Sequence, residues 1–242
     1  MSAPPAIDGA APALRAPASF LGLPTGDLED LVPGDIALVG LFLDHGDNRG
    51  FGARFAARQI RYASRPAFGM GARAPEVTGR HRGRLFDLGD LNVFPLEPPR
   101  QREALLRQFT ALLSSGARFV VVGGSADLDG IAIEAARHAD GARDLRPLTL
   151  PGAGASDART PAQADLFVTV DLAPALDPAA GRGARSRLIE AVGALPACRV
   201  RAAHLTGLAA ELDVSARAET AFASRVLEAL AGLLWRAEAP CR

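Results

Sequence analysis

Short apolar runs alternate with amphipathic, helix-like stretches along most of this chain, and this alternation restricts its fold more than any other feature. The apolar runs are rich in Val, Leu, Ile and Phe, as expected for strands buried on both faces of a sheet. The strand candidates are Asp35–Phe42, Arg84–Leu88, Ala117–Val122, Asp165–Val170 and Arg199–Leu205. The helix candidates are Glu103–Ser115, Ala126–Ala139 and Ala216–Ala237. This order predicts an α/β protein with three layers, α/β/α, around a mainly parallel sheet.

The rest of the chain predicts a simple domain organisation. Residues 1–18 are rich in Ala and Pro and are expected to form a flexible N-terminal arm. Residues 19–242 have the length of one large α/β domain. The stretch Asp140–Gln163 is rich in Gly, Ala, Asp, Arg and Pro, so we expect it to be mostly loop.

Composition excludes several classes of function. The chain has 27 basic and 27 acidic residues, so no broad attraction to nucleic acid is expected. Its two cysteines, Cys198 and Cys241, stand far apart, which argues against a disulfide framework or a structural zinc site. No apolar run approaches the roughly 20 residues of a membrane span. The N-terminus lacks the pattern of a secretory signal, so a cytoplasmic location is expected.

A dense motif begins in the first predicted strand. Residues 37–61 read ALVGLFLDHGDNRGFGARFAARQIR, and the later run LFDLGD ends in a Asp-x-Gly-Asp pattern. Together these motifs resemble the ureohydrolase family, which includes agmatinases and arginases. The resemblance implies an arginase/deacetylase-like fold, and it assigns a set of residues to turns and loops rather than to catalysis. These are Gly40, Asp44, Gly52, Arg54, Asp87, Gly89, Asp90, Gly123 and Gly124.

Enzymes of this family cleave guanidino groups with a pair of metal ions, and the resemblance shows where their metal ligands would stand. Ala126 takes the place of a ligand histidine, and Ala173 takes the place of the second carboxylate of an Asp-x-Asp pair whose first member is Asp171. The late position of a substrate-binding glutamate is Gly207. Only 46 residues separate Gly124 from Asp171, so the central metal-ligand segment is shortened, and we expect a strand and its ligand loop to be deleted.

Two closely spaced divalent ions need several carboxylates to offset their repulsion. One aspartate does not meet that need, so we expect no catalytic residue, metal or other cofactor in this chain. The pattern resembles the shorter, non-catalytic subunit of the heteromeric metformin hydrolases. It implies a metal-bearing ureohydrolase paralogue as partner, in a trimer- or hexamer-type assembly. The partner would hold a nickel or manganese pair and hydrolyse a guanidine or biguanide compound such as metformin.

Two other hypotheses stay open at this point. In the first alternative, the chain is a stand-alone pseudoenzyme that binds a small ligand or regulates another protein. In the second, it is a divergent hydrolase with a rebuilt site. Such a site would use Asp44, His45, Asp171 and His204. A polar turn is the simpler interpretation of the Asp44–Asp47 run, because three ligands within four residues do not converge easily on one ion.

Overall fold

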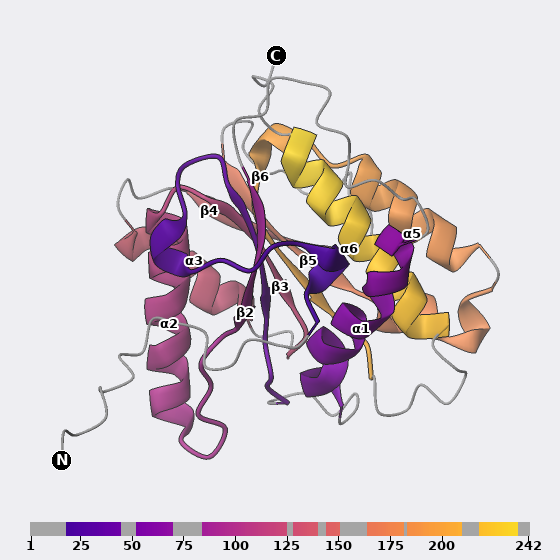
Figure 1. The fold of residues 1–242 in the computed structure, drawn as a ribbon, viewed down its shortest axis with the longest axis horizontal. Coiled ribbons are helices and arrows are strands. Elements are labelled where there is room, and N and C mark those ends of the chain that lie inside the picture. Colours follow the sequence, from indigo (N-terminus) through magenta and orange to yellow (C-terminus); the bar gives the residue numbers. More distant parts are fainter. Residues whose placement is uncertain are drawn as a thin grey trace.

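The computed structural model of the chain describes residues 18–44, 52–69, 84–124, 128–139, 144–150, 164–181, 183–209 and 218–236. Their strands form a six-stranded parallel sheet in the order β2-β1-β3-β6-β5-β4 (Figure 1). The strands are β1 Ile36–Gly40, β2 Leu85–Asp90, β3 Arg118–Val122, β4 Leu145–Leu150, β5 Asp165–Asp171 and β6 Val200–Thr206.

Helices cover both faces of this sheet and complete three layers. Helices α2 and α3 pack on one face, and α1, α5 and α6 pack on the other (Figure 1). The helices are α1 Ala56–Gly69, α2 Pro98–Ser114, α3 Leu128–His138, α4 Ala173–Leu176, α5 Ala184–Gly193 and α6 Ala218–Arg236. Short 3-10 turns are η1 Phe20–Gly22, η2 Leu28–Asp30, η3 Ala53–Phe55, η4 Pro178–Ala180 and η5 Ala197–Arg199. The predicted fold class is confirmed.

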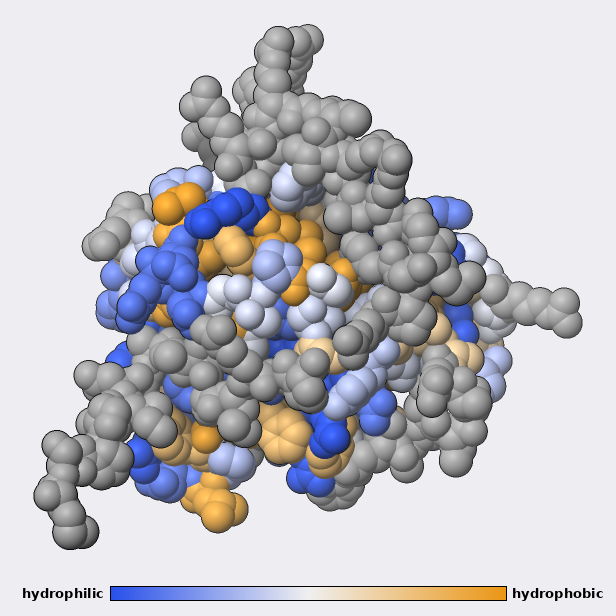
Figure 2. Space-filling view, viewed as in Figure 1, coloured by the Kyte–Doolittle hydropathy of each residue, from blue (hydrophilic) through white to orange (hydrophobic). Residues whose placement is uncertain are grey.

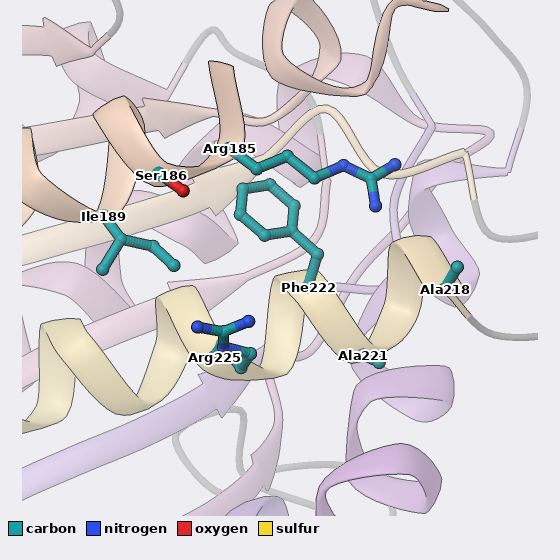
Figure 3. Close-up of a pocket in the computed structure, with 7 residues that line it drawn as sticks. All are labelled: Arg185, Ser186, Ile189, Ala218, Ala221, Phe222 and Arg225. Carbon is teal, nitrogen blue, oxygen red and sulfur yellow. The ribbon is translucent and has the colours of Figure 1, made fainter. Parts of the chain in front are cut away.

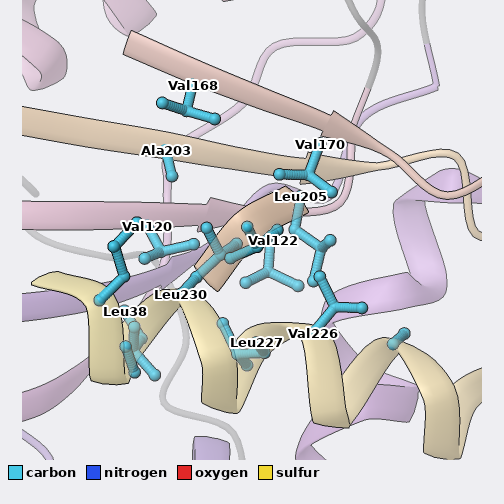
Figure 4. Packing of buried hydrophobic residues seen from close by; sticks show 14 of the residues in the cluster. Leu38, Val120, Val122, Val168, Val170, Ala203, Leu205, Val226, Leu227 and Leu230 are labelled. Carbon is cyan, nitrogen blue, oxygen red and sulfur yellow. The ribbon is translucent and has the colours of Figure 1, made fainter. Parts of the chain in front are cut away.

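Alternating strand residues supply the two halves of the core. On β3, Val120 and Val122 face α6, whereas Phe119 and Val121 face the α2/α3 side. Figure 4 shows Val226, Leu227 and Leu230 of α6 lying against the first of these faces; these α6 residues are at most 1% exposed. Burying each such side chain contributes about 1.5–3 kcal/mol.

The predicted elements are present with shifted ends, and the structure adds a strand that was not predicted. The stretch expected to be mostly loop contains β4, which pairs along its whole length with β5. The sequence LRPLTL does not look like a buried strand, because Pro147 lacks a backbone N–H donor and the nearby Arg146 and Thr149 are exposed. Proline is tolerated there because β4 is the outer strand of the described sheet.

The surface of the described residues is mixed in character. On the face drawn in Figure 2, hydrophobic residues come to the surface in several places among hydrophilic ones. The large apolar side chains that stay exposed are Val32, Phe42, Tyr62 and Leu96. Scattered exposure of this kind is normal in folded domains. None of the described helices combines the length and apolar character needed to cross a bilayer.

Candidate functional site

The carboxyl ends of the parallel strands meet at one edge of the sheet, where α/β proteins usually place their sites. Asp44 follows β1, Gly123 and Gly124 follow β3, Asp171 ends β5, and Gly207 follows β6. The structure thus brings most of the predicted family positions to one edge. Residues 45–51 and 125–127, which include His45 and Ala126, lie outside the described residues.

Asp44 fastens the start of the turn that leads into α1. Its Oδ2 accepts a hydrogen bond from the backbone nitrogen of Gly52 at 3.0 Å, and its Oδ1 accepts one from the backbone nitrogen of Arg54 at 2.7 Å. The Arg54 side chain adds a weaker ion pair, with Nε 3.5 Å from Oδ2. Both oxygens therefore satisfy local donors, as at a helix N-terminus. Asp44 is thus bound mainly by the backbone nitrogens of Gly52 and Arg54, with the Arg54 side chain at a longer distance.

Gly123 and Gly124 make a close turn after β3. Both have positive φ, +88° and +80°, and a Cβ on Gly124 would lie 2.2 Å from the side chain of Leu41. Their carbonyl oxygens accept hydrogen bonds from the next strand, Gly123 from His204 Nε2 at 2.8 Å and Gly124 from Thr206 Oγ1 at 2.7 Å. The pair is thus a tight strand-end turn locked to β6.

Asp171, which the motif comparison predicted as the first carboxylate of an Asp-x-Asp pair, lies at the end of β5 just before the short helix α4. Its Oδ1 accepts a hydrogen bond from the backbone nitrogen of Ala173 at 3.0 Å. Strand β5 ends at Asp171 and α4 begins at Ala173, so these positions do not share one strand face as an Asp-x-Asp pair was expected to. Gly207 packs against the same carboxylate.

No side chain fits at Gly207 in this arrangement. A Cβ there would lie 2.1 Å from Asp171 Oδ1 and 2.6 Å from the backbone nitrogen of Ala173. The residue also has φ +81°, which disfavours any side chain. A glutamate cannot occupy this position unless the end of β5 moves.

His204 on β6 is a buried titratable group. It lies between Val121 and Thr169 in the sheet and has no exposed surface. Burial lowers its pKa from 6.5 to about 4, against the opposing effect of the Gly123 carbonyl. At neutral pH the ring is neutral, so Nε2 donates to Gly123 and Nδ1 is an acceptor for which the described residues supply no donor.

A buried ion-pair network joins α1 to the end of β2. Arg61 Nε and Nη2 each donate to Asp87 at 2.9 Å, Nη1 lies 2.5 Å from Asp90 Oδ1, and Nη2 also donates to the Gly89 carbonyl at 2.8 Å. Burial opposes the charged guanidinium, but hydrogen bonds and charge from Asp87 and Asp90 outweigh it and raise the pKa of Arg61. The carboxylates of the Asp-x-Gly-Asp motif were expected to fix loops near the strand ends. They do so by holding this arginine.

The network also ties down the start of the described chain. Asp87 Oδ2 accepts a hydrogen bond from the backbone nitrogen of Phe20, and the Arg61 guanidinium lies 4.1 Å from the centre of the Phe20 ring. Gly40 makes room for Asp90, because a Cβ on it would lie 1.9 Å from Asp90 Oδ1. The sequence analysis named Arg61 only as the end of a motif. The signal for its role was that Arg61 directly follows Ile60, a position on the side of α1 expected to face the sheet, where a guanidinium needs buried acidic partners.

Comparison with known proteins places this architecture. A model of the arginase family matches residues 34–143. Proclavaminate amidino hydrolase from Streptomyces clavuligerus superposes with a TM-score of 0.66 at 17% identity, covering 94% of this chain and 100% of that chain. A hypothetical agmatinase from Burkholderia thailandensis gives 0.71 at 16% identity over 93% and 92%. Formimidoylglutamase from Bacillus subtilis gives 0.67 at 17% identity over 97% and 98%.

The chain has the arginase fold. The ureohydrolase resemblance suggested by its motifs is supported by the family match, and the structures confirm the expected architecture. A search of curated protein sequences finds no match.

The residues that the motif comparison marked as metal-ligand positions do not come together as a ligand cluster in this chain. Among the described residues, no three His, Cys, Asp or Glu side chains are grouped so that they could hold a metal ion. Asp44 and Asp171 accept hydrogen bonds from backbone nitrogens, and Ala173 and Gly207 offer no ligand atom. The described residues therefore do not fit a metal pair, and no catalytic step through one follows from them.

Proposed function

We propose that this chain is an arginase-family member that serves as the non-catalytic, metal-free subunit of a heteromeric ureohydrolase-type enzyme. Its partner is a metal-bearing paralogue that holds a nickel or manganese pair and hydrolyses a guanidine or biguanide compound such as metformin. The two assemble in the cytoplasm into a trimer- or hexamer-type complex that contacts neither nucleic acid nor membrane.

The observation that carries this proposal is the arrangement of residues at the carboxyl ends of β5 and β6. Where the family motif places a glutamate, Gly207 leaves no space for a Cβ beside Asp171. Where it places a second aspartate, Ala173 starts α4 and donates its backbone nitrogen to Asp171. Placing carboxylate ligands at these two positions would therefore need movement of the backbone as well as new side chains.

The intact scaffold supports a role in assembly. Arg61 and Asp87 form a buried pair with side chains 1% and 2% exposed. Unpaired buried charges are strongly destabilising, so such a network persists only while both partners and the surrounding packing persist. A chain that keeps this scaffold and gives up its ligand positions is suited to present a folded surface to related subunits.

Native mass spectrometry of this chain, co-expressed with the ureohydrolase relative from its own genome, tests the proposal. We expect a mixed oligomer whose metal content equals the number of partner copies, and hydrolysis only when the partner is present. A metal-free homo-oligomer that never associates with the relative would contradict it. Stoichiometric metal in the isolated chain would instead support a rebuilt hydrolase site.

An assembly control uses two arginines of the chain. Arg61→Met breaks the buried network and should lower the yield of the mixed oligomer through loss of folded subunit. Arg107→Met removes an exposed pair with Glu103 on α2 and should leave assembly unchanged. If both variants assemble like the original chain, the scaffold is not what the partner recognises.

A further inference from the structure

A pocket opens between the first turns of α5 and the first half of α6, the helices that follow β5 and β6 in the chain. Its cavity volume is about 170 Å³, and it is lined by Arg185, Ser186 and Ile189 of α5 and by residues of the first half of α6, including Phe222 and Arg225 (Figure 3). Pockets for drug-sized ligands measure about 300–1,000 Å³. This one is therefore suited to a smaller molecule.

Two guanidinium groups flank an apolar floor in this pocket. Figure 3 shows the Phe222 ring between Arg185 and Arg225, and the Arg185 guanidinium carbon lies 5.4 Å from the centre of that ring. The ring is buried, whereas Arg225 is exposed and Arg185 partly exposed. The aromatic contact restrains Arg185 without neutralising its charge.

Neither guanidinium is neutralised by a salt bridge to a carboxylate among the described residues. Arg225 is influenced by Glu228, one turn further along α6, but burial raises the pKa of that carboxyl and Arg225 lowers it only in part. Other exposed arginines described here, such as Arg100, Arg102 and Arg107, have carboxylate partners within 4.0 Å.

The start of α5 adds to the positive potential. The helix begins at Ala184, its N-cap Gly183 offers no side-chain acceptor, and no acidic residue lies in its first turn. That turn instead carries Arg185 and Arg187. Basic residues at the positive end of a helix dipole are unfavourable unless an anion is nearby.

From these observations we infer that the α5/α6 pocket binds a small organic anion, with its carboxylate or phosphate held by Arg185, Arg225 and the Ser186 hydroxyl. A short apolar group of the ligand lies on Phe222 and Ile189. Arginines from two helices present planar donor sets suited to oxyanions. The inference rests on the lining of this pocket and does not depend on the proposed partner subunit.

Isothermal titration of the full-length chain at constant ionic strength tests this inference with four probes. These are butanoate, its uncharged isostere butanamide, phenyl phosphate and inorganic phosphate. We expect saturable binding of butanoate or phenyl phosphate and none of butanamide. Tighter binding of butanoate points to a carboxylate as the natural ligand, and tighter binding of phenyl phosphate points to a phosphate ester.

Variants locate the binding. Arg185→Gln and Arg225→Gln should each weaken it about tenfold, as expected for loss of one charge-assisted hydrogen bond. Arg107→Gln, on the other face of the sheet, should have no effect. Ala221→Leu adds bulk at an exposed lining position without changing charge and should also block the organic probes. Far-UV circular dichroism checks that each variant is folded.

Three results would overturn the inference. One is absence of saturable binding of both organic anions, and another is equal binding of butanamide. The third is unchanged binding by the folded Arg185→Gln and Arg225→Gln variants, which would place the anion elsewhere on the chain.

Discussion

Replacing Arg61 by methionine removes the centre of the buried network while keeping a long apolar side chain. The variant leaves Asp87, which is 2% exposed, with two backbone donors, the nitrogens of Phe20 and Gly89. Removing one partner of a buried ion pair costs about 3–5 kcal/mol. Because those two hydrogen bonds remain, we expect a loss of roughly 3–4 kcal/mol in the free energy of unfolding.

Urea denaturation and thermal melting would measure this loss. A domain of this size shifts by roughly 2–4 °C per kcal/mol, so Tm should fall by about 6–16 °C. Asp87→Asn removes the unpaired charge, so the double variant Arg61→Met/Asp87→Asn should recover part of the stability lost in the single arginine variant. Arg107→Met, which removes an exposed pair, is the matched control and should change stability by less than about 0.5 kcal/mol.

A loss below about 1 kcal/mol for Arg61→Met would refute this reasoning, because that is the range of solvent-exposed ion pairs. A double variant no more stable than Arg61→Met would also contradict it. That result would attribute the loss to packing against Phe20 and not to the charge left on Asp87.

Three further predictions follow from the strand edge. His204 binds a proton more weakly in the folded chain, with its pKa lowered from 6.5 to about 4, so stability should fall as pH drops through that window, by up to about 3 kcal/mol. His204→Gln, which does not titrate, should remove this part of the pH dependence in urea denaturation at several pH values; an unchanged profile would assign it to other groups. Gly207→Ala should cost more than about 2 kcal/mol through its contacts with Asp171, whereas Gly130→Ala, in α3 with open space around its Cβ, should gain about 0.5–1 kcal/mol. Equal effects at the two glycines in thermal melts would contradict this. Asp44→Ala should lose about 1–2 kcal/mol in the same melts, because the nitrogens of Gly52 and Arg54 lose their acceptors; no loss would show that water replaces the carboxylate at little cost.

The sequence was informative wherever a segment is buried on both sides. The central strands β1, β3, β5 and β6 read as continuous apolar runs because helices cover both of their faces. Strand β4 was missed because it lies at the outside of the described sheet, where one proline and exposed polar residues are tolerated. Helix α5 was not predicted either; it has ten residues, of which only Leu188 and Val192 are buried, so its apolar stripe is short.

At the candidate site, residue types were predicted better than their contacts. The motif located Asp44, Asp87 and Asp90, but only the structure pairs the last two with Arg61, which precedes Asp87 by 26 residues. Contacts between distant segments depend on the order of the strands in the sheet, and this order cannot be read from the spacing of residues in the sequence. The steric block at Gly207 was invisible for the same reason, since it arises from Asp171 on the neighbouring strand.

The buried Arg61 network and the strand-end positions Ala173 and Gly207 are physically separate in this chain. The Arg61 network lies between α1, η1 and β2, whereas Ala173 and Gly207 lie beyond β5 and β6. Changes at the second group therefore leave the first intact. Several carboxylates converging without a cation would repel one another, so a metal-free chain is more stable with alanine and glycine at these positions. The metal-free role proposed above is therefore compatible with a stable fold, because alanine and glycine at these positions introduce no such repulsion.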